Sequence, residues 1–177
     1  MTQHHILLVD DEPHVLRVLR LALEREGYSV ATAGDGHAAL AAMAQRLPDV
    51  LISDIQMDGM DGRTLCPLAR STYPDHPFLI LVMTSMTALD ERAWARAVAN
   101  TEFLEKPLSP RQLVARLGRY FAALAAAIAV LAQDAAVAGH QRDAVTSARP
   151  AGSRGGRTVS VRTPVGPGEY HAKLPRP

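Results

Sequence analysis

The chain has 177 residues, of which 47% are hydrophobic, and one cysteine. This length allows one ordinary domain with an appendage, and the lone Cys66 excludes an internal disulfide and suits a reducing compartment. The net charge of +1 hides an asymmetry, because residues 1–118 carry 11 Lys and Arg against 15 Asp and Glu, whereas residues 119–177 carry 8 against 3. We therefore expect an acidic domain followed by a basic appendage.

The sequence shows neither a secretory signal nor an uninterrupted apolar run of the length of a membrane span. Residues 1–5 lack the basic and apolar regions of a secretory signal. The longest apolar run, residues 120–132, is mostly alanine and is shorter than the roughly 20 residues that a membrane span needs. These features predict a cytoplasmic protein without a membrane segment.

Short apolar runs alternate with helical patterns along the first two-thirds of the chain. The pattern predicts strands over residues 6–9, 28–33, 50–54, 78–83 and 103–105, and helices over residues 13–25, 37–45, 64–70 and 90–99 and from residue 110 onward. Pro67 places the start of the third helix near Thr64, and Ser109 followed by Pro110 is a strong start signal for the last helix. Five strands alternating with five helices predict an α/β fold with a doubly wound, five-stranded parallel sheet.

Charged side chains follow three of these predicted strands. Asp10 and Asp11 come after the first strand, Asp54 ends the third, and Lys106 follows the fifth. Because the carboxyl ends of parallel strands meet at one edge of a sheet, we expect these groups to lie together. Carboxylates beside an ammonium group make a site for a divalent cation and a phosphoryl group.

These residues resemble the receiver domain of two-component response regulators over about residues 4–122. The match comprises residues 8–12, the segment from Asp54 to Gly62, Thr84 with Ser85, and Lys106 with Pro107. The spacings of 44 residues from Asp10 to Asp54, 30 to Thr84 and 22 to Lys106 are also similar to those of the family. The resemblance implies a flavodoxin-like fold and a role as a phosphorylation-activated receiver in a phosphorelay.

The resemblance also assigns roles to the charged residues. It implies that Asp54 is the phosphoacceptor and that Lys106 binds the phosphoryl group. Asp10, Asp11 and Asp54, with the backbone carbonyl of Gln56, would hold Mg²⁺. The implied partners are a histidine kinase or histidine phosphotransfer protein and a downstream protein target, with no enzymatic activity beyond the receiver's own phosphorylation and dephosphorylation.

Two further residues would report the phosphorylated state. Thr84 matches the switch hydroxyl of the family and Phe103 the aromatic side chain that turns inward, although Phe103 is as well explained as a core residue. The Lys106–Pro107 peptide bond is expected to be cis, as in the family.

The chain departs from the family at two positions, and two other functions remain open. Asp58 stands where the family usually has proline, and Asn100 replaces one of two small residues before the last strand. A phosphatase with an aspartyl-phosphate intermediate is the alternative enzyme, but it needs a second Asp where this chain has Gln56. Nucleic-acid binding through the basic tail is the other alternative, and a solubilising role for the tail is favoured over it.

The appendage starts with a heptad pattern and ends in a segment rich in Arg, Gly, Pro, Ser and Thr. Apolar residues recur at alternating steps of three and four, at Val114, Leu117, Phe121, Leu124, Ile128, Leu131, Ala135 and Ala138. One interpretation is a single helix from Pro110 to Ala138 that forms a weak homodimer through residues 114–138. The alternative is that the first three residues pack on the domain's own sheet and that Gly118 interrupts the helix. We divide the chain into a receiver domain (1–122), a helical extension (123–140) and a disordered basic tail (141–177).

Overall fold

The computed structural model describes residues 3–84, 94 and 98–147, with side chains up to residue 135. In this part of the chain, five parallel strands form one sheet in the order β2–β1–β3–β4–β5. The strands are β1 (His5–Val9), β2 (Ser29–Ala33), β3 (Val50–Asp54), β4 (Leu79–Thr84) and β5 (Thr101–Glu105). The predicted α/β class and the doubly wound parallel sheet are therefore confirmed.

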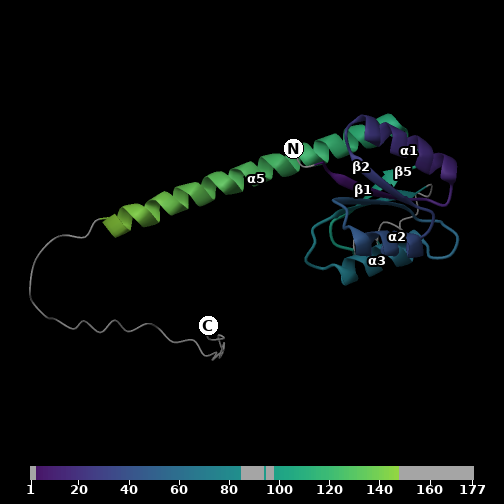
Figure 1. Cartoon of the computed structure of the whole chain (residues 1–177), viewed down its shortest axis with the longest axis horizontal. Coiled ribbons are helices and arrows are strands. Elements are labelled where there is room, and N and C mark those ends of the chain that lie inside the picture. Colours follow the sequence, from purple (N-terminus) through teal and green to yellow (C-terminus); the bar gives the residue numbers. More distant parts are fainter. Residues whose placement is uncertain (1–2, 85–93, 95–97, 148–177) are drawn as a thin grey trace, which may run out of the picture. The chain divides into compact units, whose positions relative to one another are not determined.

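Helices cover both faces of this sheet. The helix α1 (Pro13–Arg25) and the first turns of α5 (Pro110–Ser147) lie on one face, and α2 (Gly36–Gln45) and α3 (Gly62–Thr72) lie on the other (Figure 1). Successive strand residues point to opposite faces, so in β1 Ile6 and Leu8 pack with α1 and α5, whereas Leu7 and Val9 pack with α2 and α3. Because both faces are covered, the strands are apolar runs rather than alternating ones.

Short polar signals start the helices. The side chain of Asp35 accepts a hydrogen bond from Ala38 N at the start of α2, and that of Asp61 accepts one from Thr64 N at the start of α3. Ser109 Oγ accepts one from Gln112 N, as the predicted cap of α5 requires. Each cap satisfies a backbone N–H that the first turn of a helix leaves without a partner.

Two elements begin two residues earlier than predicted. The helix α3 begins at Gly62 rather than near Thr64, because Asp61 caps its first turn and the helix continues through Pro67 without that residue's N–H. The strand β5 begins at Thr101 rather than at residue 103, because Thr101 already pairs with Ile80 of β4. The helix predicted over residues 90–99 lies mostly outside the described residues.

The helix α5 is longer than predicted. It passes Gly118, where nothing lies within 4 Å of an added Cβ, and it continues beyond Ala138 to Ser147. Residues 141–147, which we assigned to a disordered tail, are therefore helical. A glycine inside a helix costs about 1 kcal/mol, which is too little to end a helix whose next residues include good helix formers. Residues 148–177 lie outside the described residues.

The chain divides into two compact units, Met1–Val130 and Leu131–Pro177. The first unit holds the sheet and its helices, and in the second the described residues are the last turns of α5.

One segment of α5, Pro110–Ala135, is long and apolar enough to cross a membrane by length and composition alone. Its first turns belong to the domain core, where Leu113 and Leu117 are fully buried and Phe121 is 8% exposed. His4 stacks on the Phe121 ring with 3.7 Å between ring centroids. Packing in the core thus accounts for the apolar residues of these first turns, and this part of the alternative interpretation of the heptad pattern is confirmed.

Candidate functional site: a carboxylate cluster at the strand tips

The fold brings the carboxyl ends of three strands to one edge of the sheet. The chain runs from β1 outward to β2 and returns across β1 to β3, so the connections that leave β1 and β3 diverge to opposite faces. In open parallel sheets the ligand site lies at such a reversal of strand order. Asp10 and Asp11 follow β1, Asp54 ends β3, and Lys106 follows β5.

Three carboxylates form the acidic part of this site. One oxygen each from Asp10, Asp11 and Asp54 lies within 4.8 Å of the others. Asp10 is fully buried and Asp54 is 7% exposed, whereas Asp11 is exposed. Three oxygen donors of this kind, partly open to water, match the preference of Mg²⁺ for a few carboxylates and retained waters.

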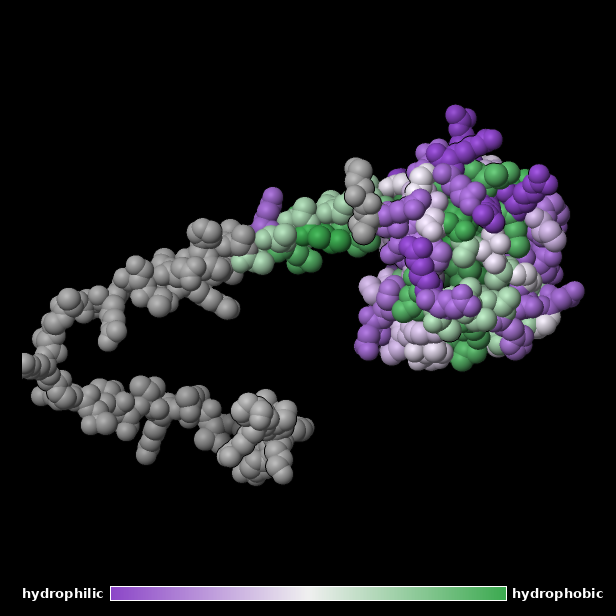
Figure 2. Space-filling view, in the orientation of Figure 1, coloured by the Kyte–Doolittle hydropathy of each residue, from purple (hydrophilic) through white to green (hydrophobic). Residues whose placement is uncertain are grey.

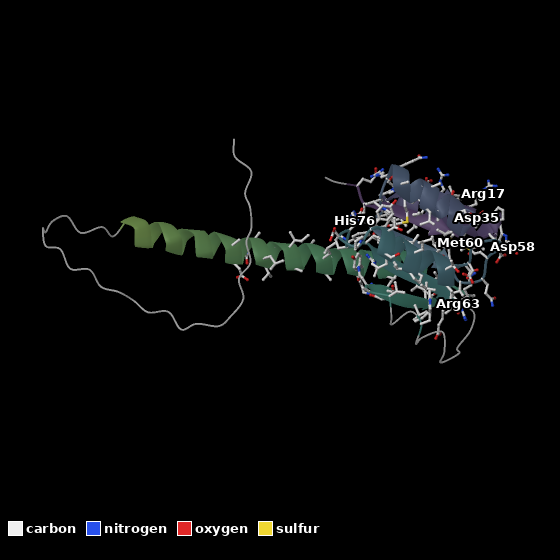
Figure 3. The ribbon with its side chains drawn as sticks, turned by 90° about the horizontal axis from the view of Figure 1, so that it is seen from below. Arg17, Asp35, Asp58, Met60, Arg63 and His76 are labelled. Atoms are coloured by element: carbon white, nitrogen blue, oxygen red, sulfur yellow. The ribbon has the colours of Figure 1, made fainter. Side chains whose placement is uncertain are left out.

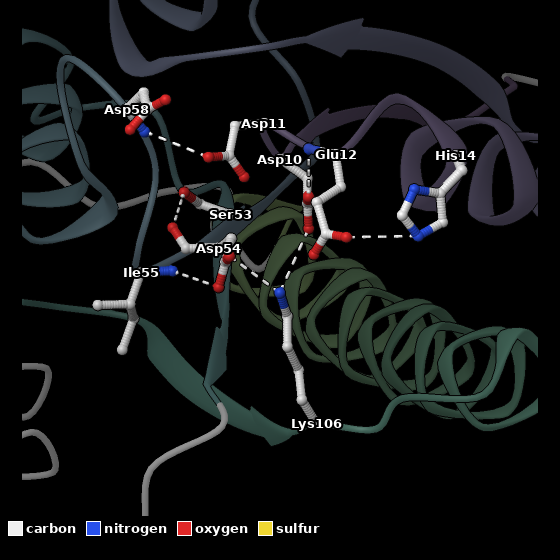
Figure 4. A network of polar contacts seen from close by, with 9 residues as sticks. All are labelled: Asp10, Asp11, Glu12, His14, Ser53, Asp54, Ile55, Asp58 and Lys106. Carbon is white, nitrogen blue, oxygen red and sulfur yellow. Dashed lines mark hydrogen bonds and ion pairs between the residues drawn. The ribbon is translucent and has the colours of Figure 1, made fainter.

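The ammonium group of Lys106 closes the site on the β5 side (Figure 4). Its Nζ lies 2.9 Å from Asp54 Oδ2 and 3.5 Å from Asp10 Oδ2. Burial by itself would lower the pKa of Lys106, but the hydrogen bond and charge of Asp54, with the charge of Asp10, outweigh it, so the pKa is raised. The lysine therefore carries a full positive charge at neutral pH.

The charge on Asp10 is costly where it lies. Burial raises the pKa of this carboxyl, and the nearby Asp54 raises it further, although the Glu12 N–H and Lys106 favour the charged form. A divalent cation at the cluster would favour the charged form of all three carboxylates. The residues present thus fit a bound metal ion.

Each carboxylate is also held by a backbone N–H. Glu12 N donates to Asp10 Oδ1 over 2.9 Å, Ile55 N donates to Asp54 Oδ1 over 2.8 Å, and Asp58 N donates to Asp11 Oδ2 over 3.3 Å. The Asp58 contact is one that sequence reasoning missed. The sequence feature that could have indicated this contact is the replacement of the family's usual proline by Asp58, because proline has no N–H to donate.

Gly62 lets the loop after β3 lie against the end of its own strand. A Cβ at this position would lie 2.1 Å from the carbonyl oxygen of Asp54, and Gly62 N donates to the Ile55 carbonyl over 2.9 Å. Gly59 and Gly62 have different roles in this loop. Gly59 bends it with a φ of +76°, whereas Gly62 is needed for the close approach.

The remaining predicted site residues lie around this centre. Thr84 is buried at the end of β4, and its carbonyl accepts a hydrogen bond from Lys106 N over 2.7 Å. Phe103 is partly buried and packs against the core under α2 and α3. Gln56 is exposed and, with Asp11, Asp58 and other residues, lines a hollow of about 510 Å³ beside the cluster. The Lys106–Pro107 bond is cis, as predicted.

Residues 6–118 match the family model described as the response regulator receiver domain. The chain belongs to this family. It is thus a receiver domain of two-component systems, and the interpretation drawn from the strand-end residues is confirmed.

Individual relatives agree with this assignment. The receiver is 39% identical over 112 residues to the response regulator MprA of Mycobacterium leprae, a match that covers 63% of this chain and 48% of that protein. It is 34% identical over 112 residues to the probable transcriptional regulatory protein TcrX of Mycobacterium tuberculosis, covering 63% of this chain and 47% of that protein. The match therefore spans about half the length of these relatives.

Solved structures show the same fold. The chemotaxis protein CheY4 of Vibrio cholerae superposes on the receiver with a TM-score of 0.63 at 32% identity, covering 67% of this chain and 98% of that structure. A receiver domain protein of Methanospirillum hungatei gives 0.62 at 26% identity, covering 67% and 94%. The flavodoxin-like architecture is therefore confirmed.

Proposed function

We propose that this receiver is switched by phosphorylation of Asp54, with Mg²⁺ bound by Asp10, Asp11, Asp54 and the backbone carbonyl of Gln56. The observation that carries the proposal is the 2.9 Å contact between Lys106 Nζ and Asp54 Oδ2 beside the carboxylate cluster. A carboxylate accepts a phosphoryl group only where the repulsion between the two anions is neutralised. Bound Mg²⁺ would supply part of that neutralisation, and Lys106 supplies the rest.

The transfer needs a donor with a labile phosphoryl group, such as a phosphohistidine. The N–P bond of the donor breaks, an O–P bond to a carboxylate oxygen of Asp54 forms, and the departing imidazole nitrogen takes up a proton from water. Lys106, which pairs with Asp54 before transfer, then pairs with a phosphoryl oxygen. Thr84, at the end of the neighbouring strand, supplies the hydroxyl that turns toward the new group, and Phe103 repacks with it. Such contacts shift the population between two arrangements of the loops.

The donor in this proposal is a histidine kinase or a histidine phosphotransfer protein, and the output is a contact with a downstream protein. A cytoplasmic location suits a relay that draws on ATP and a chain whose one thiol, Cys66, is buried and free. The phosphatase alternative is disfavoured because Gln56 has no carboxyl group to act as a general acid. The nucleic-acid alternative rests on residues beyond the described part of the chain.

Intact-mass measurement after incubation with a small acyl phosphate and Mg²⁺ tests the phosphoacceptor. We expect one phosphoryl adduct on the wild-type chain, none without Mg²⁺, and none on the variant Asp54→Asn. Asp75→Asn is the matched control, because Asp75 is an exposed aspartate that does not belong to the carboxylate cluster. An adduct of equal yield on Asp54→Asn would contradict the assignment.

We further propose that α5 joins two copies of the chain in a weak homodimer. Leu124, Ile128 and Leu131 continue the heptad pattern and are 40%, 58% and 68% exposed, and Figure 2 shows hydrophobic surface along this stretch of the helix. No charged residue occurs between Arg119 and Asp134, so the stripe offers nothing to select an oppositely charged partner. A second copy presents the same apolar stripe in the same register and is complementary to it.

A further inference from the structure

The three carboxylates of the cluster are held in two different ways. Asp10 and Asp54 accept hydrogen bonds from Glu12 N and Ile55 N, donors that lie two residues and one residue further along the chain. Their orientation is therefore set by the local backbone at the end of each strand. Asp11 instead accepts from Asp58 N, 47 residues away in the sequence. Its orientation depends on where the loop between β3 and α3 lies.

Among the residues that the structure describes, Asp58 N is the hydrogen-bond donor to the Asp11 carboxylate. Asp10 and Asp54 have Lys106 as an additional partner, whereas Asp11 is exposed and free to rotate without the loop. A hydrogen bond from an N–H to one oxygen restricts the rotation of a carboxylate and so limits where its other oxygen lies. For a ligand of Mg²⁺, which requires nearly ideal octahedral geometry, such fixing matters.

The loop fixes the direction of the Asp58 N–H from both sides. Met57, immediately before it, is 9% exposed and is part of the core under α2 and α3. Gly59, immediately after it, has a φ of +76°, a conformation that favours glycine. The Asp58 side chain itself is exposed and lies at the opposite end of the domain from His76 (Figure 3). The backbone of Asp58 is thus fixed, while its side chain is free to be changed.

We propose that Asp58 is a positioning residue of the cation site, which acts through its main-chain N–H by orienting Asp11. The proposal rests on the proposed function, since it takes Mg²⁺ as the ligand of the cluster. Any residue except proline can supply this N–H. The Asp58 carboxylate adds negative charge beside the cluster, and that charge is a separate, salt-screened contribution to the attraction of the cation.

Two substitutions in the full chain separate the N–H from the charge. Asp58→Ala and Asp58→Pro both remove the carboxylate, but only Asp58→Pro removes the N–H. Titration with Mg²⁺ by calorimetry should give an affinity for Asp58→Ala within about threefold of the wild type. Asp58→Pro should bind about tenfold more weakly than Asp58→Ala, as is usual when a group that orients a metal ligand is lost. Equal affinities of the two variants would overturn the proposal.

A second measurement avoids the proline variant, which could disturb the loop. Amide hydrogen exchange by NMR on the metal-free chain should show that Asp58 N–H exchanges several-fold faster in Asp11→Ala than in the wild type. The Ile55 amide, which bonds to Asp54 and to the Met83 carbonyl, is the internal control and should not change. Unchanged exchange at Asp58 would overturn the orienting contact.

The outcomes also distinguish this proposal from the proposed function. A wild-type chain that binds no Mg²⁺ and takes up no phosphoryl group would overturn both. A wild-type chain that does both, with equal Mg²⁺ affinity for Asp58→Ala and Asp58→Pro, would overturn the role of Asp58 alone.

Discussion

Gly62 and Gly118 are two helical glycines with opposite surroundings. A Cβ on Gly62 would lie 2.1 Å from the Asp54 carbonyl oxygen, a backbone atom that cannot move without shifting the proposed phosphoacceptor. A Cβ on Gly118, within α5, would have nothing within 4 Å. Replacement of glycine by alanine should therefore lower the stability of the domain at position 62 and raise it at position 118.

We expect Gly62→Ala to lower the free energy of unfolding by about 3 kcal/mol, because overpacking against fixed atoms forces the backbone to move. Gly118→Ala should raise it by about 0.5–1 kcal/mol, because alanine loses less conformational freedom in a helix than glycine. Urea unfolding of the three chains, followed by far-ultraviolet circular dichroism, measures both changes. A loss of stability in Gly118→Ala equal to that in Gly62→Ala would contradict the argument.

Asn100 is another position where a single residue controls the backbone. It has a φ of +55°, its side-chain amide donates to the carbonyls of Pro77 and Phe78, and its own carbonyl accepts from Ile80 N. Asparagine tolerates the left-handed conformation better than most residues because its short polar side chain can bond locally. The backbone therefore makes a left-handed turn at Asn100 just before β5.

At the scale of an element, α3 begins earlier than its proline suggested. Pro67 is the sixth residue of the helix and has no N–H to donate to the carbonyl four residues before it. Leu65, Cys66 and Ala69 are fully buried in the core, and burial raises the pKa of the Cys66 thiol to about 12. Packing of this apolar face and the Asp61 cap outweigh the missing hydrogen bond.

Replacing the proline should therefore stabilise the domain. We expect Pro67→Ala to raise the free energy of unfolding by about 1–2 kcal/mol, because the gain of a helical N–H exceeds the added freedom of the unfolded chain. Ser71→Ala, on the same helix and exposed, should change it by less than about 0.5 kcal/mol. Thermal unfolding of both variants tests this expectation, and a decrease for Pro67→Ala would mean that the proline is better accommodated than the hydrogen-bond count implies.

At the scale of the whole molecule, α5 serves two environments in succession. Leu113, Leu117 and Phe121 are buried in the domain core, whereas Leu124 and Ile128 on the same helix are 40% and 58% exposed. An exposed apolar stripe on a helix is an unusual surface for a monomer. The residues that flank the stripe are mostly alanine, so the stripe offers little apolar area to bury. At roughly 25 cal/mol per Å² of buried apolar area, we therefore expect the self-association of the chain to be weak.

We expect Ile128→Glu to reduce self-association at high protein concentration, because it places a charge in the centre of the stripe. Ala126→Glu is the matched control, since Ala126 is exposed on the opposite side of the heptad. Sedimentation velocity over a range of concentrations should show a rising average mass for the wild type and Ala126→Glu, and a constant mass for Ile128→Glu. A constant monomer mass for the wild type, with and without phosphodonor, would leave the helix without this role.

The sequence alone determined the sheet, the order of its elements and the charged residues of the site. This was possible because a buried strand is a short apolar run and because the carboxyl ends of parallel strands meet at one edge. For this reason the sequence alone groups Asp10, Asp11, Asp54 and Lys106 at one site. Their chemical roles as acceptor, metal ligands and phosphate-binding cation came from the resemblance and remain predictions.

Tertiary structure decided what depends on contacts between distant segments. The cap by Asp61 and the core packing of α3 overrode the local signal of Pro67, and α5 continues through residues 141–147, whose composition had placed them in the tail. The close approach of Gly62 to the Asp54 carbonyl and the reach of Asp58 N to Asp11 depend on the path of one loop through space. Periodicity and local propensity depend on residues that are close in the sequence. The contacts named above join residues that are distant in the sequence and become neighbours only when the chain folds.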